Sequence, residues 1–296
     1  MPPLCLFGIV NITEDSFSDG GRYLDPAAAI AHARALVAAG ARVIDLGAAA
    51  SNAHAQPVGA AEEIRRLDPV IAALAAADTP ISVDSFLPEV QRFAIARGVA
   101  FLNDIQGFPD PSLYPDLAAA SCKLVVMHSV QGQGRAQRVE LAAHEVWDRI
   151  HRFFEERLAA LERGGIVRAR LVLDPGMGLF LSSRPEASLR VLTGLGRLKR
   201  DFGLPVAVSV SRKSFLRAIT GRASAVGAGA ATLAAEIYAA EMGADYIRTH
   251  DPQALADALK VMAALRSQEA RLNPGQDGGG SGPDCTGALP GGVPGA

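Results

Sequence analysis

The chain has 296 residues, of which 49% are hydrophobic and 20% charged, and its formal net charge is −2. This length suits one barrel of about 250 residues or two smaller domains, and the near-neutral charge without a Lys/Arg block argues against a bulk nucleic-acid binder. The chain has no apolar run of roughly 18 residues for a membrane span, no positive leader and no metal-like cysteine spacing, so we expect a soluble, cytoplasmic protein.

Eight short apolar runs follow one another along the chain, and each ends in polar residues. In chain order they are expected to form strands at residues 4–10, 43–46, 81–84, 101–104, 124–128, 171–174, 206–211 and 246–250. A helix-like segment separates each run from the next; Asp25-Pro26 opens the first of these helices, and Pro69 is expected to break or kink the second. Parallel strands need helical crossovers, and eight such units close a barrel. We therefore expect an α/β fold, a single (β/α)8 TIM barrel.

The composition changes after the last expected helix, which runs from about Pro252 to Gln268. Between Leu272 and Ala296 about half of the residues are glycine or proline, and large apolar side chains are rare. Such a segment cannot bury enough surface to offset its ordering entropy. The expected organisation is a barrel domain over residues 1–268 and a disordered Gly/Pro-rich tail over residues 269–296.

Active sites of such barrels lie where the strands end, so the polar strand ends should converge on one mouth. Asp84, Asn103 and Asp174 form a donor and acceptor set that could hold a flat heterocycle. The alternative interpretation is that each aspartate only caps the helix that follows it.

Two further motifs indicate an anionic substrate. Ser211-Arg212-Lys213-Ser214 places two cations at a helix N-terminus, and Arg248-Thr249-His250 ends the last strand, where barrels often bind phosphate. A solvated turn and a structural histidine are the alternatives. The polar loop from Asn11 to Gly21 is either a substrate-covering loop or an ordinary surface loop. Without a Cys/His cluster, the expected metal is Mg²⁺ carried on a substrate phosphate.

At these motifs the chain resembles the dihydropteroate synthases. The resemblance covers residues 4 to about 266 and rests on stretches that occur in the family's order: 8–13, 15–21, 81–85, 102–105, 126–128, 174–178, 211–214 and 247–250. A closer likeness, carried by residues 103–111, 208–216 and 244–250, is to the mobile, sulfonamide-resistance members of that family.

The resemblance implies a transferase of folate biosynthesis that condenses 6-hydroxymethyl-7,8-dihydropterin pyrophosphate with p-aminobenzoate to give 7,8-dihydropteroate and pyrophosphate. It assigns Asp84, Asp174 and Lys213 as catalytic residues and a homodimer as the assembly. It divides the binding residues among three parts of the site: Asp84, Asn103, Met127, Asp174 and Lys213 for the pterin; Asn11, Arg248 and His250 for the pyrophosphate, with Asn11 also on Mg²⁺; and Ser51, Ser211, Phe17 and Phe180 for p-aminobenzoate.

The chain departs from the family pattern in two places. Asn52 stands about where the family has an arginine on the pyrophosphate, and Arg22 or His54 are candidate replacements. Leu179-Phe180 stands where many members have Phe-Gly. We expect insensitivity to sulfonamides through bulk at the p-aminobenzoate rim, with Phe17, Phe108 and Phe180 as the candidates.

Two other functions share parts of this pattern. A methyltransferase barrel that uses methyltetrahydrofolate would share the Asp/Asn pterin set, but would not need the loop at residues 15–21 or the motif at residues 211–214. A pterin-binding paralogue without turnover would explain the altered second loop, and it would bind pterin without releasing pyrophosphate.

Overall fold

The computed structural model describes residues 4–13, 25–49, 58–131 and 138–272. The predictions for Phe17, Arg22, Ser51, Asn52 and His54 fall outside these ranges, as does most of the expected tail. The chain divides at Ala258 into two units, and the one described below comprises the residues up to that point.

Eight parallel strands form a nearly closed barrel, in the order β6-β5-β4-β3-β2-β1-β8-β7. β6 and β7 stand at the two ends of this order. Leu173 of β6 forms a bridge with Val206, the residue before β7, and the Leu173 amide donates to the Pro205 carbonyl at 2.9 Å. The expected single (β/α)8 TIM barrel is confirmed. The strands are β1 Cys5–Asn11, β2 Val43–Gly47, β3 Ile81–Asp84, β4 Phe101–Asp104, β5 Lys123–Met127, β6 Leu171–Asp174, β7 Ala207–Val208 and β8 Tyr246–Thr249.

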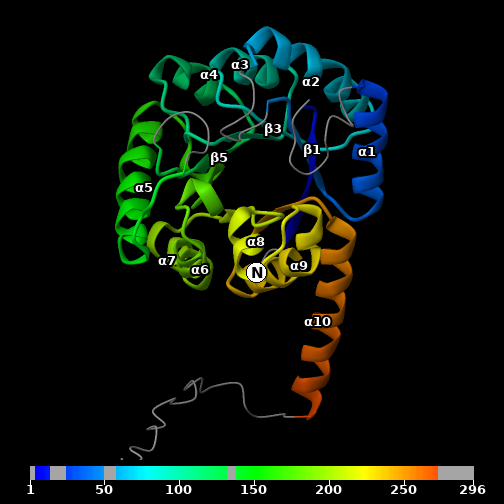
Figure 1. The fold of residues 1–296 in the computed structure, drawn as a ribbon. Coiled ribbons are helices and arrows are strands. Elements are labelled where there is room, and N and C mark those ends of the chain that lie inside the picture. Colours follow the sequence, from blue (N-terminus) through cyan, green and yellow to red (C-terminus); the bar gives the residue numbers. More distant parts are fainter. Residues whose placement is uncertain (1–3, 14–24, 50–57, 132–137, 273–296) are drawn as a thin grey trace, which may run out of the picture. The chain divides into compact units, whose positions relative to one another are not determined.

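Helices follow the strands and surround them in Figure 1, as the crossovers of a parallel sheet require. Asp25 caps the first helix as expected, and its carboxylate accepts from the amides of Ala27 and Ala28. The helices are α1 Pro26–Ala38, α2 Ala60–Ala75, α3 Pro88–Ala96, α4 Tyr114–Ala119, α5 Val146–Arg163, α6 Pro185–Thr193, α7 Gly196–Phe202, α8 Ser214–Thr220, α9 Gly229–Glu241 and α10 Pro252–Leu272. No helix within the described ranges has the length and apolar character needed to cross a membrane.

Most strand ends lie within one residue of those expected from the sequence, and three elements differ more. Of the break or kink expected at Pro69, the break is wrong, because α2 continues through this residue to Ala75, and the kink stays a prediction. The last helix runs to Leu272 rather than ending near Gln268. The seventh strand has two residues, because the chain turns soon after Val208 and the Lys213 amide donates to the Val210 carbonyl at 3.2 Å.

The barrel interior is filled near the amino ends of the strands. A buried layer there consists of Phe7, Val43, Phe101, Val125, Val172 and Ala207, each from a different strand. The rings of Phe7 and Phe101 meet edge to face with 4.9 Å between their centroids, a geometry that aromatic pairs favour. Packing of this end leaves polar chemistry to the opposite end, where the strands finish.

Candidate active site

The strand register places the predicted site residues side by side. Asn11 is the Cα partner of Gly47, Gly47 of Asp84, and Asp84 of Asn103, so one row crosses the ends of β1 to β4. Met127, at the end of β5, pairs with Asp174 at the end of β6. The convergence that the sequence predicted follows directly from this register.

A buried ion-pair cluster lies at the centre of the mouth. The guanidinium of Arg248 donates from Nε to Asp45 Oδ2 at 3.0 Å and from Nη2 to the same oxygen. The same Nη2 also donates to Asp84 Oδ2 at 2.6 Å. Arg248 therefore holds carboxylates from β2 and β3 together, from its own position on β8.

Asp45 is a site residue to which the sequence assigned no role. Its side chain is 1% exposed and lies in the middle of the apolar strand β2. A buried carboxylate needs a charged or hydrogen-bonding partner, so its place in an apolar run was a signal that such a partner exists. The sequence did not show that the partner is Arg248, 203 positions away.

Asn103 offers unused hydrogen-bonding capacity beside this cluster. It is fully buried, and neither its Nδ2 nor its Oδ1 has a hydrogen-bond partner among the described residues. Buried amide groups in proteins are nearly always satisfied. An amide left in this state at the mouth of a barrel fits a ligand with both a donor and an acceptor.

Asp174 ends β6 and is held by the turn that follows. Its Oδ1 accepts from the Gly176 amide at 2.8 Å, while the described residues give Oδ2 no hydrogen bond. Gly176 has φ of +72°, and a Cβ there would lie 2.4 Å from the carbonyl oxygen of His128. Only glycine fits this approach, so the turn that positions Asp174 depends on it.

His128, at the end of β5, supports this turn as a neutral side chain. Its Nδ1 donates to the Pro175 carbonyl at 3.0 Å. Burial lowers the pKa of His128 to about 4, although the bond to Pro175 opposes the shift. The imidazole is therefore uncharged near neutral pH and acts here as a structural donor.

Burial favours the neutral forms of the acids and of the lysine at the mouth, and it shifts their pKa values accordingly. It raises the pKa of Asp84 and of Asp174, against the pull of Arg248 and Lys213. Burial, followed by repulsion from Arg248, lowers the pKa of Lys213. For Arg248 burial alone would lower the pKa, but Asp45 and Asp84 raise it. Such opposed shifts in one cleft are typical of functional sites.

An apolar wall borders the charged groups. Ile105, Met127 and Phe180 pack together, and Lys213 Nζ lies 5.2 Å from the centroid of the Phe180 ring. This distance is within the range of a cation–π contact. The wall thus lies beside the ammonium of Lys213, through Phe180, and beside Asp174, through its register partner Met127.

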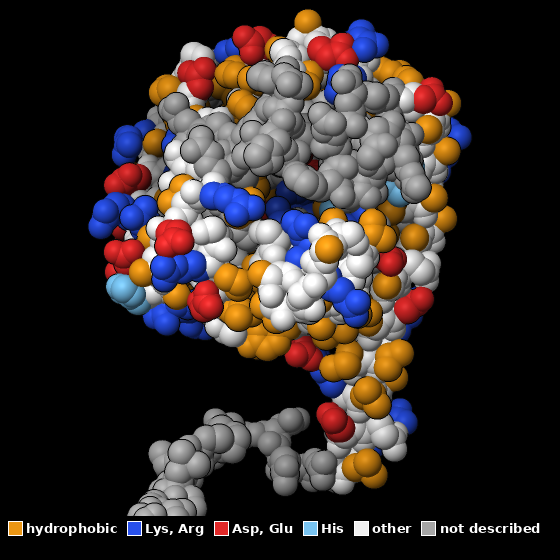
Figure 2. Space-filling view, in the orientation of Figure 1, with side chains coloured by type: hydrophobic (Ala, Val, Ile, Leu, Met, Phe, Trp, Pro, Cys, Tyr) orange, Lys and Arg blue, Asp and Glu red, His pale blue; other side chains and the backbone are white. Residues whose placement is uncertain are grey.

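The ends of β7 and β8 are joined by Ser211 and His250. The Ser211 hydroxyl oxygen lies 2.8 Å from His250 Nδ1 and accepts from the His250 amide at 3.2 Å. This contact brings the two predicted anion-binding motifs together. Figure 2 shows basic side chains, in blue, gathered near the middle of the face over α8 and beside the grey residues.

Asn11 is the residue that could hold a metal. Its amide oxygen Oδ1 would lie 3.6 Å from a Cβ at Gly47, so the absence of a side chain there leaves room beside this oxygen. Within the described residues there is no cluster of three His, Cys, Asp or Glu side chains suited to a metal. A single amide oxygen fits Mg²⁺ that is carried mainly by phosphate oxygens and water.

Phe108 does not lie at a rim. Its side chain is 1% exposed, and its backbone has φ of +60°. The Phe108 amide donates to Asp104 Oδ2 at 3.1 Å, and its carbonyl accepts from Tyr114 and Arg157. The residue is thus part of the packed loop after β4, which makes it a poor candidate for drug exclusion.

Comparison with known proteins shows which family the chain is similar to. Residues 7–250 match the family described as pterin binding enzyme. The chain is 60% identical over 269 residues to dihydropteroate synthase type-2 of Escherichia coli, covering 91% of this chain and 98% of that protein. Two solved structures of Xanthomonas albilineans dihydropteroate synthase each cover 90% of this chain and 94% of their own. The one with 4-aminobenzoic acid is 37% identical with a TM-score of 0.80, and the one with 7,8-dihydropteroate is 34% identical with a TM-score of 0.75.

Proposed function

The chain belongs to the dihydropteroate synthases, within the pterin-binding enzymes, and we propose that it catalyses their reaction. A dihydropterin that carries a hydroxymethyl pyrophosphate is condensed with p-aminobenzoate. The C–O bond to the pyrophosphate breaks, a C–N bond to the arylamine forms, and the amine loses one proton. The observation that carries this proposal is the buried amide of Asn103, unpartnered among the described residues, beside Asp84, its register partner at the mouth.

The pterin is proposed to bind between the acids and the apolar wall. Asp174 Oδ2 would accept from ring N–H donors, and the Asn103 amide would pair with a neighbouring donor and acceptor on the ring. Met127 offers the apolar surface for the ring face, and Phe180, packed against it, borders the p-aminobenzoate side. As the C–O bond breaks, positive charge develops on the methylene carbon and pterin, and the carboxylates of Asp84 and Asp174 stabilise it.

The leaving pyrophosphate is proposed to bind at the ends of β1 and β8. Arg248 and His250 would donate to its oxygens, and Asn11 would hold Mg²⁺ carried on them. When bound, the metal would stabilise the negative charge of the leaving group. Ser211, which contacts His250, would orient that donor.

The arylamine attacks as a neutral nitrogen and needs little help from a base. Ser211 and Lys213 would line its path, with Lys213 between the two substrates. Catalysis then depends mainly on holding the amine in line with the breaking C–O bond, an effect of position rather than of proton transfer.

The pH dependence of kcat/KM should be bell-shaped. As the pH falls, Asp84 and Asp174 become protonated, and because burial raises their pKa values the acid limb should lie above the ordinary carboxyl range. As the pH rises, Lys213 loses its proton, and because burial lowers its pKa the basic limb should lie below the ordinary lysine range.

The basic limb can be assigned with Lys213→Arg, because arginine stays charged throughout and should move the limb to higher pH. Lys199→Arg is the control, since Lys199 pairs with Asp245 before β8 begins. A basic limb at the same pH in wild type and Lys213→Arg would contradict the role of Lys213.

The reaction itself is tested by pyrophosphate release from the dihydropterin pyrophosphate in the presence of p-aminobenzoate. We expect release that depends on both substrates and on Mg²⁺. Binding of the pterin without release would instead indicate a paralogue that has lost turnover. Transfer of a methyl group from methyltetrahydrofolate would indicate the alternative barrel enzyme.

We further propose that the enzyme is insensitive to sulfonamides, through bulk at the p-aminobenzoate rim. The support is the position of the Phe180 ring beside Lys213, together with the sequence likeness to resistance-type members. In the release assay with sulfamethoxazole, Phe180→Ala should lower the inhibitory concentration by about 10- to 200-fold relative to wild type. Phe17→Ala is the second variant, and unchanged inhibition in both would remove this part of the proposal.

We propose a homodimer that works in the cytoplasm. Ile219, Val226 and Tyr238, from α8, α9 and the segment between them, are large apolar side chains exposed to solvent, which suits contact between outer helices. Cys5 and Cys122 are free thiols, as is usual in a reducing compartment. Sedimentation at micromolar concentration would show whether two chains associate.

A further inference from the structure

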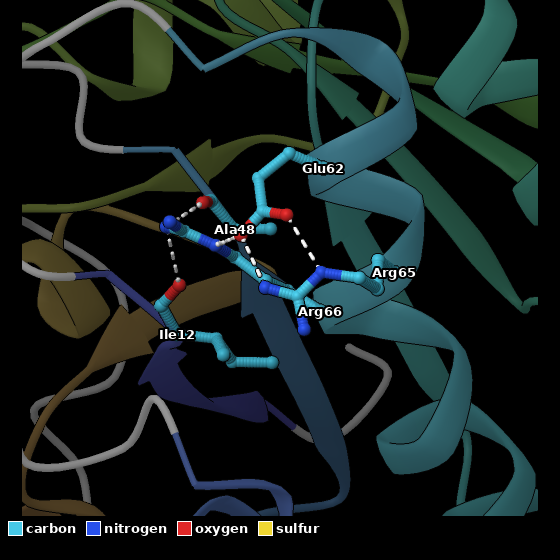
Figure 3. Close-up of polar contacts among 5 residues, drawn as sticks. All are labelled: Ile12, Ala48, Glu62, Arg65 and Arg66. Atoms are coloured by element: carbon cyan, nitrogen blue, oxygen red, sulfur yellow. Dashed lines mark hydrogen bonds and ion pairs between the residues drawn. The ribbon is translucent and has the colours of Figure 1, made fainter.

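Arg66 lies behind the mouth, on the second turn of α2, and is absent from the set of substrate-binding residues. Its side chain is only 7% exposed, although arginine is usually a surface residue. Figure 3 shows its guanidinium pointing from α2 toward the chain at the ends of β1 and β2. A buried cation in this place needs partners, and those partners belong to three separate segments.

The guanidinium joins two strand ends to the helix. Nη1 of Arg66 donates to the carbonyl of Ala48 at 3.2 Å and to that of Ile12 at 3.4 Å. Its Nε donates to Glu62 Oε1 at 2.6 Å, one turn earlier on α2. One planar donor group therefore links the residues that follow β1 and β2, and Glu62 fixes its orientation (Figure 3).

These contacts pin the peptide next to Asn11 from both sides. The Ile12 amide donates to the Gly47 carbonyl at 2.8 Å, while the Ile12 carbonyl accepts from Arg66. Asn11 directly precedes this peptide, and its Oδ1 lies beside Gly47, the residue before Ala48. The separation of the two strand ends thus sets where the Asn11 side chain stands.

We propose that Arg66 is a positioning residue for the pyrophosphate and Mg²⁺ end of the site, acting through the backbone of Ile12 and Ala48 on Asn11. This inference rests on the proposed function. Arg66 touches no substrate in this assignment. Its loss would leave two carbonyls without their charged donor and free the ends of β1 and β2 to shift relative to each other.

Arg65 provides a matched control on the same helix. It binds the same carboxylate, donating from Nε to Glu62 Oε2 and from Nη2 to Oε1, both at 2.7 Å. Its side chain is 74% exposed, and among the described residues its hydrogen-bond partner is Glu62 alone, with no bond to either strand end (Figure 3). Arg65→Met therefore removes the same charge and a bond to the same partner, but leaves the link between β1 and β2.

The test compares Arg66→Met, Arg65→Met and wild type by steady-state kinetics and by calorimetry. In Arg66→Met we expect the KM for the dihydropterin pyrophosphate to rise about 10- to 100-fold, as for outer-shell partners of metal ligands. The KM for p-aminobenzoate should change little. Calorimetric binding of inorganic pyrophosphate with Mg²⁺ should weaken by a similar factor, while binding of 6-hydroxymethyl-7,8-dihydropterin, which lacks the pyrophosphate, should be retained. Arg65→Met should resemble wild type in every measurement.

Arg66→Lys is the control for a general loss of folding. It keeps a buried cation but lacks the fork that serves Glu62 and both carbonyls at once, so pyrophosphate binding should fall between wild type and Arg66→Met. Equal binding of both ligands in Arg66→Met and Arg65→Met would overturn the inference, and so would an equal loss of pterin and pyrophosphate binding in Arg66→Lys. A wild-type protein that releases no pyrophosphate would count against the proposed function alone, since the two calorimetric measurements need no turnover.

Discussion

Arg248→Met should lower the free energy of unfolding by about 3–5 kcal/mol, the usual cost of leaving one partner of a buried ion pair behind. Asp45 is 1% exposed and would keep its carboxylate in the barrel without the guanidinium that now binds it. Asp84 would lose the same donor. Urea unfolding at neutral pH measures the change, as a lower midpoint with an unchanged slope.

The same experiment has an internal control in a surface pair. Arg92→Met removes the partner of Asp116, but both side chains are more than 40% exposed, so the loss should be under about 1 kcal/mol. Adding Asp45→Asn to Arg248→Met should recover part of the stability, because the buried charge is then gone. Equal midpoints for Arg248→Met and Arg92→Met would show that the buried cluster does not stabilise the barrel.

The pH dependence of this loss has a definite sign. Without Arg248, the folded-state pKa of Asp84 should rise further, because burial already raises it and the largest opposing charge is gone. The part of the cost of Arg248→Met that comes from Asp84 is then fully present above this raised pKa. It should shrink as the pH falls through that pKa, since the protonated acid carries no buried charge.

The architecture could be predicted because each strand carries two signals in the sequence. A continuous apolar run indicates burial on both faces, and a polar residue at its end marks the mouth, as at Asp84, Asn103 and Asp174. Both signals are local in the sequence. They predict which residues lie at the mouth, but not which of these residues bind one another.

The pairing of Arg248 with Asp45 lay beyond the sequence for this reason. Asp45 belongs to the polar strand ends that were expected at the mouth, but local order along the chain does not pair it with a residue on β8, 203 positions away. The buried position of Phe108, which had been a rim candidate, could not be read from the sequence either. Its loop after β4 has a positive φ at Phe108 and a bond from the Phe108 amide to Asp104, and neither is a local sequence signal.

The boundary differences also have local causes. Pro69 removes one amide donor, but a helix with buried Leu67, Val70 and Ile71 on its inner face gains enough from packing to continue through it. β7, in contrast, is shorter than expected, although its residues favour a strand. Packing and chain direction, which a single sequence does not show, determine the length of α2 and of β7.

Asp174→Asn should lower kcat/KM for the dihydropterin pyrophosphate by about a hundredfold or more. The substitution keeps the size of the side chain, and the amide oxygen can still accept from Gly176 as Oδ1 does now. The NH2 group then occupies the place of Oδ2 and meets the ring donors that the carboxylate would have accepted. Each hydrogen bond to a charged group contributes about 1.5–3 kcal/mol, and about 1.4 kcal/mol is a tenfold change, so two lost bonds exceed a hundredfold.

The control for Asp174→Asn is Asp116→Asn, on the exposed pair with Arg92, which should leave kcat/KM unchanged. Calorimetry with 6-hydroxymethyl-7,8-dihydropterin should show a comparable loss of binding in Asp174→Asn, while inorganic pyrophosphate with Mg²⁺ should still bind. This pattern is the reverse of the one expected for Arg66→Met, so the two variants divide the mouth into a pterin end at β6 and a pyrophosphate end at β1. Retention of pterin binding in Asp174→Asn would mean that Asp174 only holds the turn at Gly176, and the acceptor of the pterin would have to be sought at Asp84.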